Sequence, residues 1–203
     1  MNKEEKLKLL NELKKKMLKD KNLPLRKGAT NLVFGEGNPN AKILCLGEGP
    51  GYWEDQKGRP FVGNAGSLLN QLLYSIKVPR EEVFITNVVH HRPPDNRDPL
   101  PEEMTAYAKY LDEIIKIIKP KVILTLGRFS MGKFLPGVKI TSVHGKIYKV
   151  NWNGEELVVI PMFHPAAALR SGQVLNQIKE DFLKIPEILK ELDKPVIKQM
   201  QFI

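Results

Sequence analysis

The sequence contains a single cysteine, Cys45, among its 203 residues. One thiol cannot form an intramolecular disulfide or a site built from several cysteine ligands, and a chain without disulfides is typical of a reducing compartment. The N-terminus is charged and lacks the apolar segment of a secretory signal, and no apolar run approaches the ~20 residues of a membrane span. We therefore expect a cytoplasmic protein that does not cross a membrane.

Acidic residues are scarce relative to basic ones: 23 Asp and Glu against 32 Lys and Arg give a formal net charge of +9. Residues 1–27 hold ten basic and four acidic residues, so most of the excess lies there. A basic surplus suits a phosphate-rich partner such as a nucleic acid. An amphipathic helix over 3–19, with Leu10, Leu13 and Met17 facing the core, accounts for the same charge as a solvated face. The charge therefore supports nucleic acid without identifying it.

The chain also lacks an internal repeat and a linker that would divide it. We expect one domain over residues 1–203, with a basic N-terminal helix within 1–22 and a loose tail over 195–203. Short apolar segments predict four buried strands, at 41–46, 83–89, 121–126 and 157–161. Helical patterns alternate with them, at 65–76, 101–118 and 175–183, and Pro186 opens a last helical segment.

Strands that alternate with helices predict a parallel sheet. We therefore expect an α/β fold, a three-layer α/β/α domain around a central four-stranded parallel sheet. Residues 140–150 are predicted as the first arm of a hairpin that enters the last strand. In folds of this class, ligands bind at the carboxyl ends of the strands.

The connection after the first predicted strand is unusually long. It runs for about seventeen residues from Gly47 to Gly63, whereas such connections usually take ~2–6. It includes Gly49 and Gly51, which let backbone approach a ligand closely, and carboxylates and aromatic rings that no core requires. This density predicts a functional site.

Three polar residues follow three different predicted strands: Glu48, Asn87 and His164. A carboxylate, an amide and an imidazole at one sheet edge fit recognition of a nucleobase. An Asn amide matches the N3–H and O4 of uracil. Phe61 could stack on the base, Glu48 could activate water, and His164 could donate a hydrogen bond to the departing base anion.

Each of these residues also has a purely structural interpretation. Glu48 could accept hydrogen bonds from backbone amides, and Asn87 could be a buried amide at a strand end. Phe61 alone is more often a core residue, and His164, which precedes a proline, could simply cap a helix. The convergence of three strands favours a site over these alternatives.

The motifs together resemble family 4 uracil-DNA glycosylases, over roughly residues 23–185. The first motif is Gly47-Glu48-Gly49-Pro50-Gly51 with Glu54-Asp55 and Pro60-Phe61-Val62-Gly63, the second is Thr86-Asn87-Val88-Val89 with Arg92-Pro93-Pro94 and Asn96-Arg97, and the third is His164-Pro165-Ala166-Ala167 with Leu169-Arg170. The set is highly specific, whereas a lone glycine-rich loop would be weak.

The resemblance implies a role for each matching residue. Glu48 and His164 would be catalytic, the first in the hydrolytic step and the second by stabilising the leaving uracil. Gly47, Gly49, Glu54, Phe61 and Asn87 would bind uracil, with Glu54 crowding out the 5-methyl group of thymine. Arg92, Arg97, Leu169 and Arg170 would contact DNA, with Leu169 as the wedge that enters the duplex while the base is extruded. No metal ligand is expected among them.

One departure from the resemblance concerns a cofactor. The family carries four cysteines that hold an iron–sulfur cluster, and alignment places Asp20, Leu23, His91 and Tyr107 at those positions. Thiolates are the usual ligands of such clusters. We therefore expect no cluster, no other cofactor and no bound metal, with Leu23 and Tyr107 filling the vacated space by packing.

Three hypotheses of function follow. The leading one is a monofunctional and monomeric glycosylase that hydrolyses the N-glycosidic bond of uracil in single- or double-stranded DNA. The second is a relative that binds uracil in DNA with little or no turnover. The third, an unrelated enzyme with a phosphate-binding loop, lacks the lysine and the serine or threonine expected after the glycines.

Overall fold

The computed structural model describes residues 1–194, so the predicted loose tail over 195–203 lies outside the described residues. Its centre is a six-stranded sheet in the order β1-β3-β2-β4-β6-β5. The strands are β1 (Glu36–Gly37), β2 (Ile43–Gly47), β3 (Phe84–Asn87), β4 (Val122–Leu126), β5 (Tyr148–Trp152) and β6 (Glu155–Met162). The prediction of an α/β fold is confirmed.

The predicted extent of the sheet is wrong, because the sheet is mixed and has six strands. The four strands expected from the sequence pair in parallel, β3 with β2, β2 with β4 and β4 with β6. Two edge strands pair antiparallel: β1, which was not predicted, and β5, which forms the predicted hairpin with β6. β1 has only two residues, and β5 is nowhere fully buried, so neither has the continuous apolar run of a central strand.

Eight α-helices accompany the sheet in the described residues. They are α1 (Lys3–Lys19), α2 (Tyr52–Lys57), α3 (Asn64–Ser75), α4 (Pro101–Ile118), α5 (Arg128–Gly132), α6 (Ile140–Val143), α7 (Pro165–Ala168) and α8 (Gly172–Asp193). The helices predicted over 3–19 and 101–118 are confirmed to the residue. In α1, Asn2 accepts from the Glu5 amide and Glu5 from that of Asn2, a capping box that fixes the helix start.

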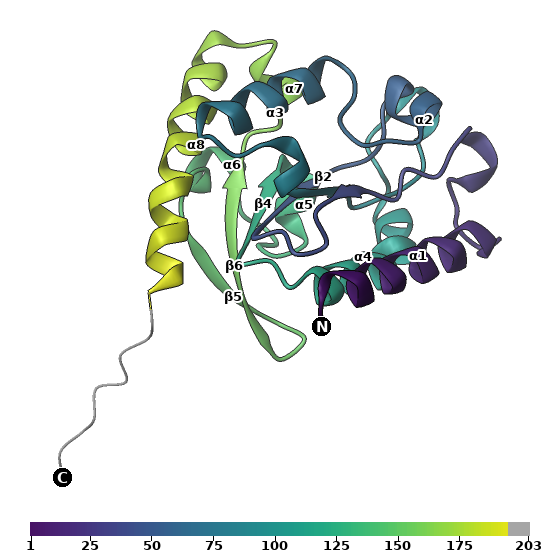
Figure 1. Ribbon diagram of the computed structural model, residues 1–203. Helices are drawn as coiled ribbons and strands as arrows, with labels where there is room; N and C mark the ends of the chain where they lie inside the picture. Colours follow the sequence, from purple (N-terminus) through teal and green to yellow (C-terminus); the bar gives the residue numbers. More distant parts are fainter. Residues whose placement is uncertain (195–203) are drawn as a thin grey trace.

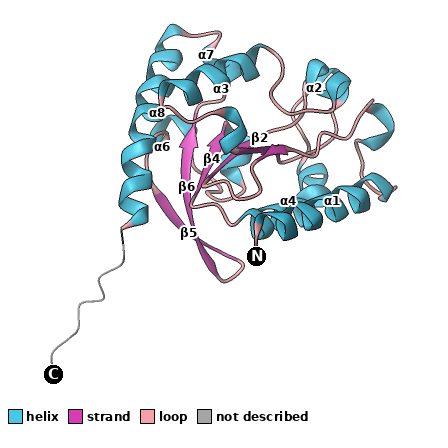
Figure 2. Cartoon of the chain, viewed as in Figure 1, coloured by secondary structure: helices cyan, strands magenta, loops and turns pink. Residues whose placement is uncertain are grey.

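Alternate residues of the strands enter two separate cores. In β2, Leu44 and Leu46 pack with α1 and α4, whereas Ile43 and Cys45 pack with α3 and α8. This follows from the two-residue period of a strand. The helices therefore cover both faces of the sheet, α1 with α4 on one side and α3 with α8 on the other, as Figures 1 and 2 show.

Three local predictions need correction. The long connection contains a helix, α2, and residues 140–143 form α6 instead of a hairpin arm. The two helical segments predicted at the C-terminal end are one helix, α8, with Pro186 inside it. A proline in a helix interior costs one backbone hydrogen bond, and the packing of buried residues that precede it, Phe182 and Ile185 among them, offsets this cost. Among residues 1–194, we find no helix with the length and apolarity to span a membrane.

Candidate active site at the carboxyl edge of the sheet

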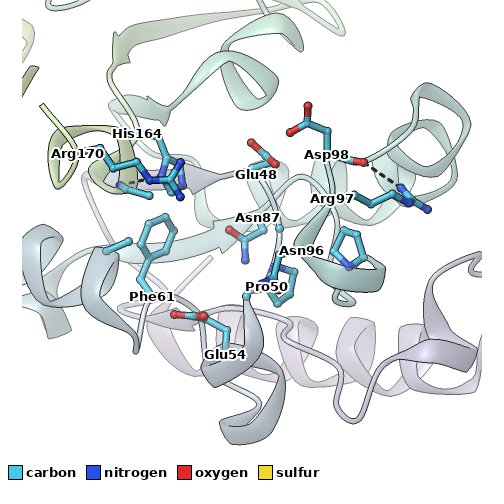
Figure 3. A pocket seen from close by; sticks show the side chains of 15 residues that line it. Glu48, Pro50, Glu54, Phe61, Asn87, Asn96, Arg97, Asp98, His164 and Arg170 are labelled. Atoms are coloured by element: carbon cyan, nitrogen blue, oxygen red, sulfur yellow. Dashed lines mark hydrogen bonds between the residues drawn. The ribbon is translucent and has the colours of Figure 1, made fainter.

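A cavity of about 370 Å³ opens at the carboxyl ends of the central strands. This volume is within the range of small-molecule sites, ~300–1,000 Å³. Eight of the predicted site residues line it: Glu48, Gly49, Glu54, Phe61, Asn87, Arg97, His164 and Arg170. Figure 3 shows how the side chains of all of them but Gly49 surround a common space. The structure thus brings together residues that lie far apart in the sequence. Gly47, Arg92 and Leu169 do not line the cavity.

Gly47 ends β2 where Phe61 and Asn87 come closest to the backbone. A Cβ atom on Gly47 would lie 2.3 Å from Asn87 Oδ1 and 2.6 Å from Phe61 Cε2, so any side chain there would displace both groups. Phe61 itself has a φ of 50°, a left-handed conformation that is strained for a bulky residue. Gly66 permits it, because a Cβ there would lie 1.9 Å from the Phe61 carbonyl oxygen.

Asn87 is the last residue of β3, and only 1% of its surface is exposed. Among the described residues, no donor reaches its buried Oδ1 atom. A buried amide oxygen without a partner costs ~1–3 kcal/mol, so native proteins keep few of them outside functional sites. Its side chain lies at the floor of the cavity (Figure 3).

His164 follows β6 and is the N-cap of α7, so its structural interpretation as a helix cap is confirmed. Its Nδ1 atom accepts a hydrogen bond from the amide of Ala166 at 3.1 Å. Burial lowers the pKa of His164 to about 4, which keeps the ring neutral. Because Nδ1 is an acceptor, the neutral ring carries its proton on Nε2. The ring stacks near Phe61, with 5.8 Å between centroids.

Glu48 follows β2 in a half-buried position. Burial, and secondarily the negative charge of Asp98, raises the pKa of Glu48 to about 7, while Arg128 opposes the shift. Asp98 and Arg128 form an ion pair with each other. Sequence reasoning missed both residues, although the acidic Asp98 stands in the same polar loop as Arg92 and Arg97. The arrangement leaves Glu48 near the pH at which a carboxyl group can exchange protons.

Glu54 lies on α2 and fixes the loop that carries Phe61. Its Oε1 atom accepts hydrogen bonds from the amides of Val62 and Gly63, each at 2.8 Å. Gly63 is the N-cap of α3, so the carboxylate also lies at the start of that helix, where negative charge is favourable. Glu54 therefore joins α2, the Phe61 loop and α3 at one side of the cavity.

The four residues predicted to contact DNA lie around the cavity. Arg92 donates from Nε to Asn96 at 2.7 Å. Arg97 forms two hydrogen bonds with Glu103, at 2.6 and 2.9 Å. On the far side, Arg170 lines the cavity and Leu169 follows α7 with 51% of its surface exposed.

The positions where the resemblance implies cluster ligands do not fit an iron–sulfur cluster. Asp20 accepts from the Tyr110 hydroxyl at 2.7 Å and from Lys109 at 2.9 Å. His91 Nδ1 is paired with the Tyr107 hydroxyl at 2.7 Å, and Leu23 is buried. The one thiol, Cys45, lies inside β2, where burial raises its pKa to about 12. Over residues 1–194, no three His, Cys, Asp or Glu side chains group as metal ligands.

Residues 34–189 match the family model of the uracil DNA glycosylase superfamily. The chain therefore belongs to this superfamily. It is 46% identical to a type-4 uracil-DNA glycosylase of Sulfurisphaera tokodaii, over 88% of this chain and 84% of that protein. It is also 42% identical to a type-4 uracil-DNA glycosylase of Archaeoglobus fulgidus (88% and 92%) and 45% identical to one of Thermotoga maritima (83% and 88%). The resemblance to this family inferred from the motifs is confirmed.

Proposed function

We propose that the cavity excises uracil from DNA. The protein is a uracil-DNA glycosylase, which hydrolyses the N-glycosidic bond of uracil, releases the free base and leaves an abasic site. The observation that carries the proposal is the buried, unpartnered Oδ1 atom of Asn87, a residue that lines the same cavity as Glu48 and His164. The family of the chain and the names of its type-4 relatives agree with it.

In this proposal, Asn87 recognises the pairing edge of uracil and Phe61 stacks on its ring. The Asn87 side chain offers an acceptor and a donor side by side, which complements N3–H and O4 of the base. A cytosine presents a donor and an acceptor in the reverse order and is rejected. Gly47 and Gly49 let the base approach the backbone, and Glu54 narrows the space at carbon 5 of the pyrimidine.

The chemical step replaces the bond between C1′ and N1 with a bond from C1′ to a water oxygen. The electron pair of the broken bond leaves with the base as a uracil anion. His164 donates a hydrogen bond from Nε2–H to that anion, and because the ring is already neutral it stabilises the charge without transferring a proton first. Glu48, as a carboxylate, accepts the proton of the attacking water or stabilises the positive charge of the sugar.

Extrusion of the base requires contacts outside the cavity. Leu169 fills the gap that the base leaves, and Arg92 and Arg170 contact flanking phosphates, with Arg97 contributing less because Glu103 already binds it. We also propose that the protein works as a monomer, as a single domain over 1–203, and in the cytoplasm, where a lone thiol stays reduced.

The protein is also proposed to work without an iron–sulfur cluster. The paired Asp20 and His91 side chains, the buried Leu23 and the hydroxyl of Tyr107 support this. Iron analysis and a visible absorption spectrum of the pure protein test it. We expect iron well below stoichiometric amounts and no absorption above the protein band, and stoichiometric iron would contradict the proposal.

The activity is tested with oligonucleotides that contain one uracil, single-stranded and paired with guanine or adenine. After incubation and treatment with alkali, we expect cleavage only at the uracil position. Glu48→Gln in parallel controls for contaminating enzyme. Binding to the uracil strand without cleavage would instead favour a uracil-DNA binding protein that does not turn over.

A further inference from the structure

Two large aromatic side chains stand exposed in the first turn of α2. Tyr52 exposes 48% of its surface and Trp53 exposes 57%. Their rings meet edge to face, with 5.2 Å between centroids and an angle of 77°. No core requires them, because the buried residue of α2 is Asp55. An exposed aromatic pair beside a binding cavity is a feature that the proposed uracil pocket does not explain.

The residue that follows the two aromatic residues on α2, Glu54, lines the cavity. Trp53 lies beside Gly63, since a Cβ there would be 3.7 Å from Trp53 Cδ1. Tyr52 lies beside Arg92, whose guanidinium is 5.3 Å from the Tyr52 ring. Arg92 in turn holds Asn96, another residue of the cavity wall. The pair therefore lies next to residues of the cavity wall, on the side of α2, without lining the cavity itself.

A buried anchor holds this turn in place. Asp55 is 2% exposed and accepts hydrogen bonds from the amides of Thr30, at 2.9 Å, and Asn31, at 3.1 Å. The Asn31 side chain donates back to the Asp55 carbonyl oxygen at 2.7 Å. α2 is therefore fixed to the 30–31 loop while its aromatic side chains remain exposed, so a ligand meets two preorganised rings.

The charges around the rings indicate the ligand. Arg92 lies over Tyr52, and the Lys57 ammonium is 6.0 Å from the Trp53 ring. Cations next to exposed aromatic faces are the combination that binds single-stranded nucleic acid, with bases on the rings and phosphates near the cations. The cavity beside them is the proposed site of one extruded base, so the base nearest to these rings belongs to a neighbouring nucleotide.

We propose that Tyr52 and Trp53 form a second base-binding site, which stacks on the unpaired nucleobase next to the extruded uracil in single-stranded DNA. The inference rests on the proposed function. In duplex DNA that neighbour stays paired and stacked, so the contact is lost. Base–aromatic stacking contributes ~1–3 kcal/mol, so the site makes the enzyme prefer uracil in single strands by roughly five- to 150-fold in KM.

Tryptophan fluorescence tests the site without any turnover. The chain has two tryptophans, and Trp152 lies far along the sheet against Phe134, so Trp152→Phe leaves Trp53 as the only reporter. A uracil-free single strand should quench Trp53 with saturation. A strand of equal length and charge, with abasic sites in place of bases, should bind in an anisotropy assay without that quenching. Equal quenching by both strands, or binding without quenching, would overturn the proposal.

Steady-state kinetics test its effect on excision. Tyr52→Ala and Trp53→Ala should each raise KM on single-stranded uracil substrate about ten-fold, with kcat nearly unchanged and little effect on duplex. Trp53→Phe should restore most of the affinity. Tyr74→Ala is the matched control, since Tyr74 is 85% exposed on α3 and lies away from the cavity. Alanine at such exposed positions leaves the fold intact.

A modified substrate isolates the neighbouring base. Two single-stranded substrates are compared, one without the base 5′ to uracil and one without the base 3′ to it. One of the two should raise the KM of the wild-type enzyme, and the same substrate should not raise the KM of Trp53→Ala further. Unchanged KM values in both alanine variants, with normal excision, would refute this site and leave the proposed function standing. Absence of excision by every variant together with base-dependent quenching would refute the function and leave the site.

Discussion

The cavity and the region around Tyr107 differ in how they treat buried polar groups. At the cavity, the Oδ1 atom of Asn87 is buried and unpartnered among the described residues, and burial keeps Glu48 and His164 away from their ordinary pKa values. Around Tyr107, the hydroxyl is paired with His91 although both side chains are buried. The Asn87 amide is therefore buried at an unfavourable cost, whereas Tyr107 and His91 satisfy each other, although the neighbouring His90 has a buried Nδ1 atom with no partner among the described residues.

This difference separates function from stability. Unpaired, desolvated groups cost free energy in the folded protein and are kept where a ligand uses them. A paired and tightly packed region contributes to folding and is indifferent to the substrate. Changes at the cavity should therefore alter excision, and changes around Tyr107 should alter unfolding.

The largest expected effect is on stability. Tyr107 is fully buried on α4, in the core that α1 and α4 share with the sheet. Tyr107→Ala should lower the free energy of unfolding by about 3–5 kcal/mol, because it leaves a cavity and unpairs His91. Urea unfolding measures the loss. Tyr107→Phe removes only the hydroxyl and should cost about 1–3 kcal/mol.

Excision provides the counterpart of this experiment. Well below its unfolding transition, Tyr107→Phe should cleave a uracil oligonucleotide at the wild-type rate. A large fall in kcat at full folding would show that the Tyr107 region takes part in function, and the separation would be wrong.

The next effect concerns Asn87. Asn87→Ala should lower kcat/KM for uracil excision roughly 10²–10³-fold, the loss typical of one preorganised hydrogen-bonding group. The free energy of unfolding should not fall with it, because no described partner of the Oδ1 atom is lost. Affinity for uracil-free DNA should stay within a factor of two of wild type. Wild-type excision by this variant would remove the proposed base recognition.

The same two regions show what sequence reasoning could reach. The polar residues Glu48, Asn87 and His164 follow three apolar strands, and the parallel-sheet rule was enough to place them at one edge. Asp98 and Arg128 were not predicted as neighbours of Glu48, because their effect on its pKa depends on three-dimensional proximity that no local pattern encodes. Around Tyr107, the substituted cluster positions could be located, but the hydrogen bond to His91 could not.

The edges of the fold were the least predictable. β1 has two residues and pairs with β3 through contacts distant in sequence, so its strand character comes from its neighbour. α2 was hidden in a glycine-rich loop, where helix propensity is weak and the buried Asp55 anchor supplies the stability. Tertiary contacts decide such segments, and these contacts are not visible in a short sequence window.

A smaller effect on stability is expected at Glu48. Its pKa is about 7 in the folded protein against an ordinary 4.5, so the folded state disfavours the charged form. The unfavourable contribution of Glu48 to the free energy of unfolding is therefore absent below about pH 4.5, grows as the pH rises, and is complete above about pH 7. Glu48→Gln should therefore stabilise the protein at pH 8, by on the order of 1–2 kcal/mol after discounting for solvent exposure.

Urea unfolding at pH 8 and pH 4 measures this difference. Glu113→Gln, the same change at an exposed position of α4, provides the background at each pH. The excision rate of the wild type should rise on its acid limb with a midpoint near pH 7, if the carboxylate form of Glu48 is the active one. A gain for Glu48→Gln that is equal at both pH values would contradict the raised pKa.

The smallest effect separates two arginines on the same loop. Within residues 1–194, Arg92 binds only the neutral Asn96 side chain and the Tyr52 ring, whereas Arg97 is neutralised by two hydrogen bonds to Glu103. A phosphate contact requires an uncompensated charge, since affinity comes from the release of counterions. Arg92→Gln should therefore reduce the slope of log Kd against log salt concentration by about 0.7 on single-stranded DNA.

Arg97→Gln should change the slope less and instead lower the unfolding midpoint, because it leaves the buried Glu103 carboxylate without its partner. If Arg97→Gln gave the larger change in slope, its pairing with Glu103 would have to break when DNA binds, and the loop would belong to the functional region instead of the stabilising one.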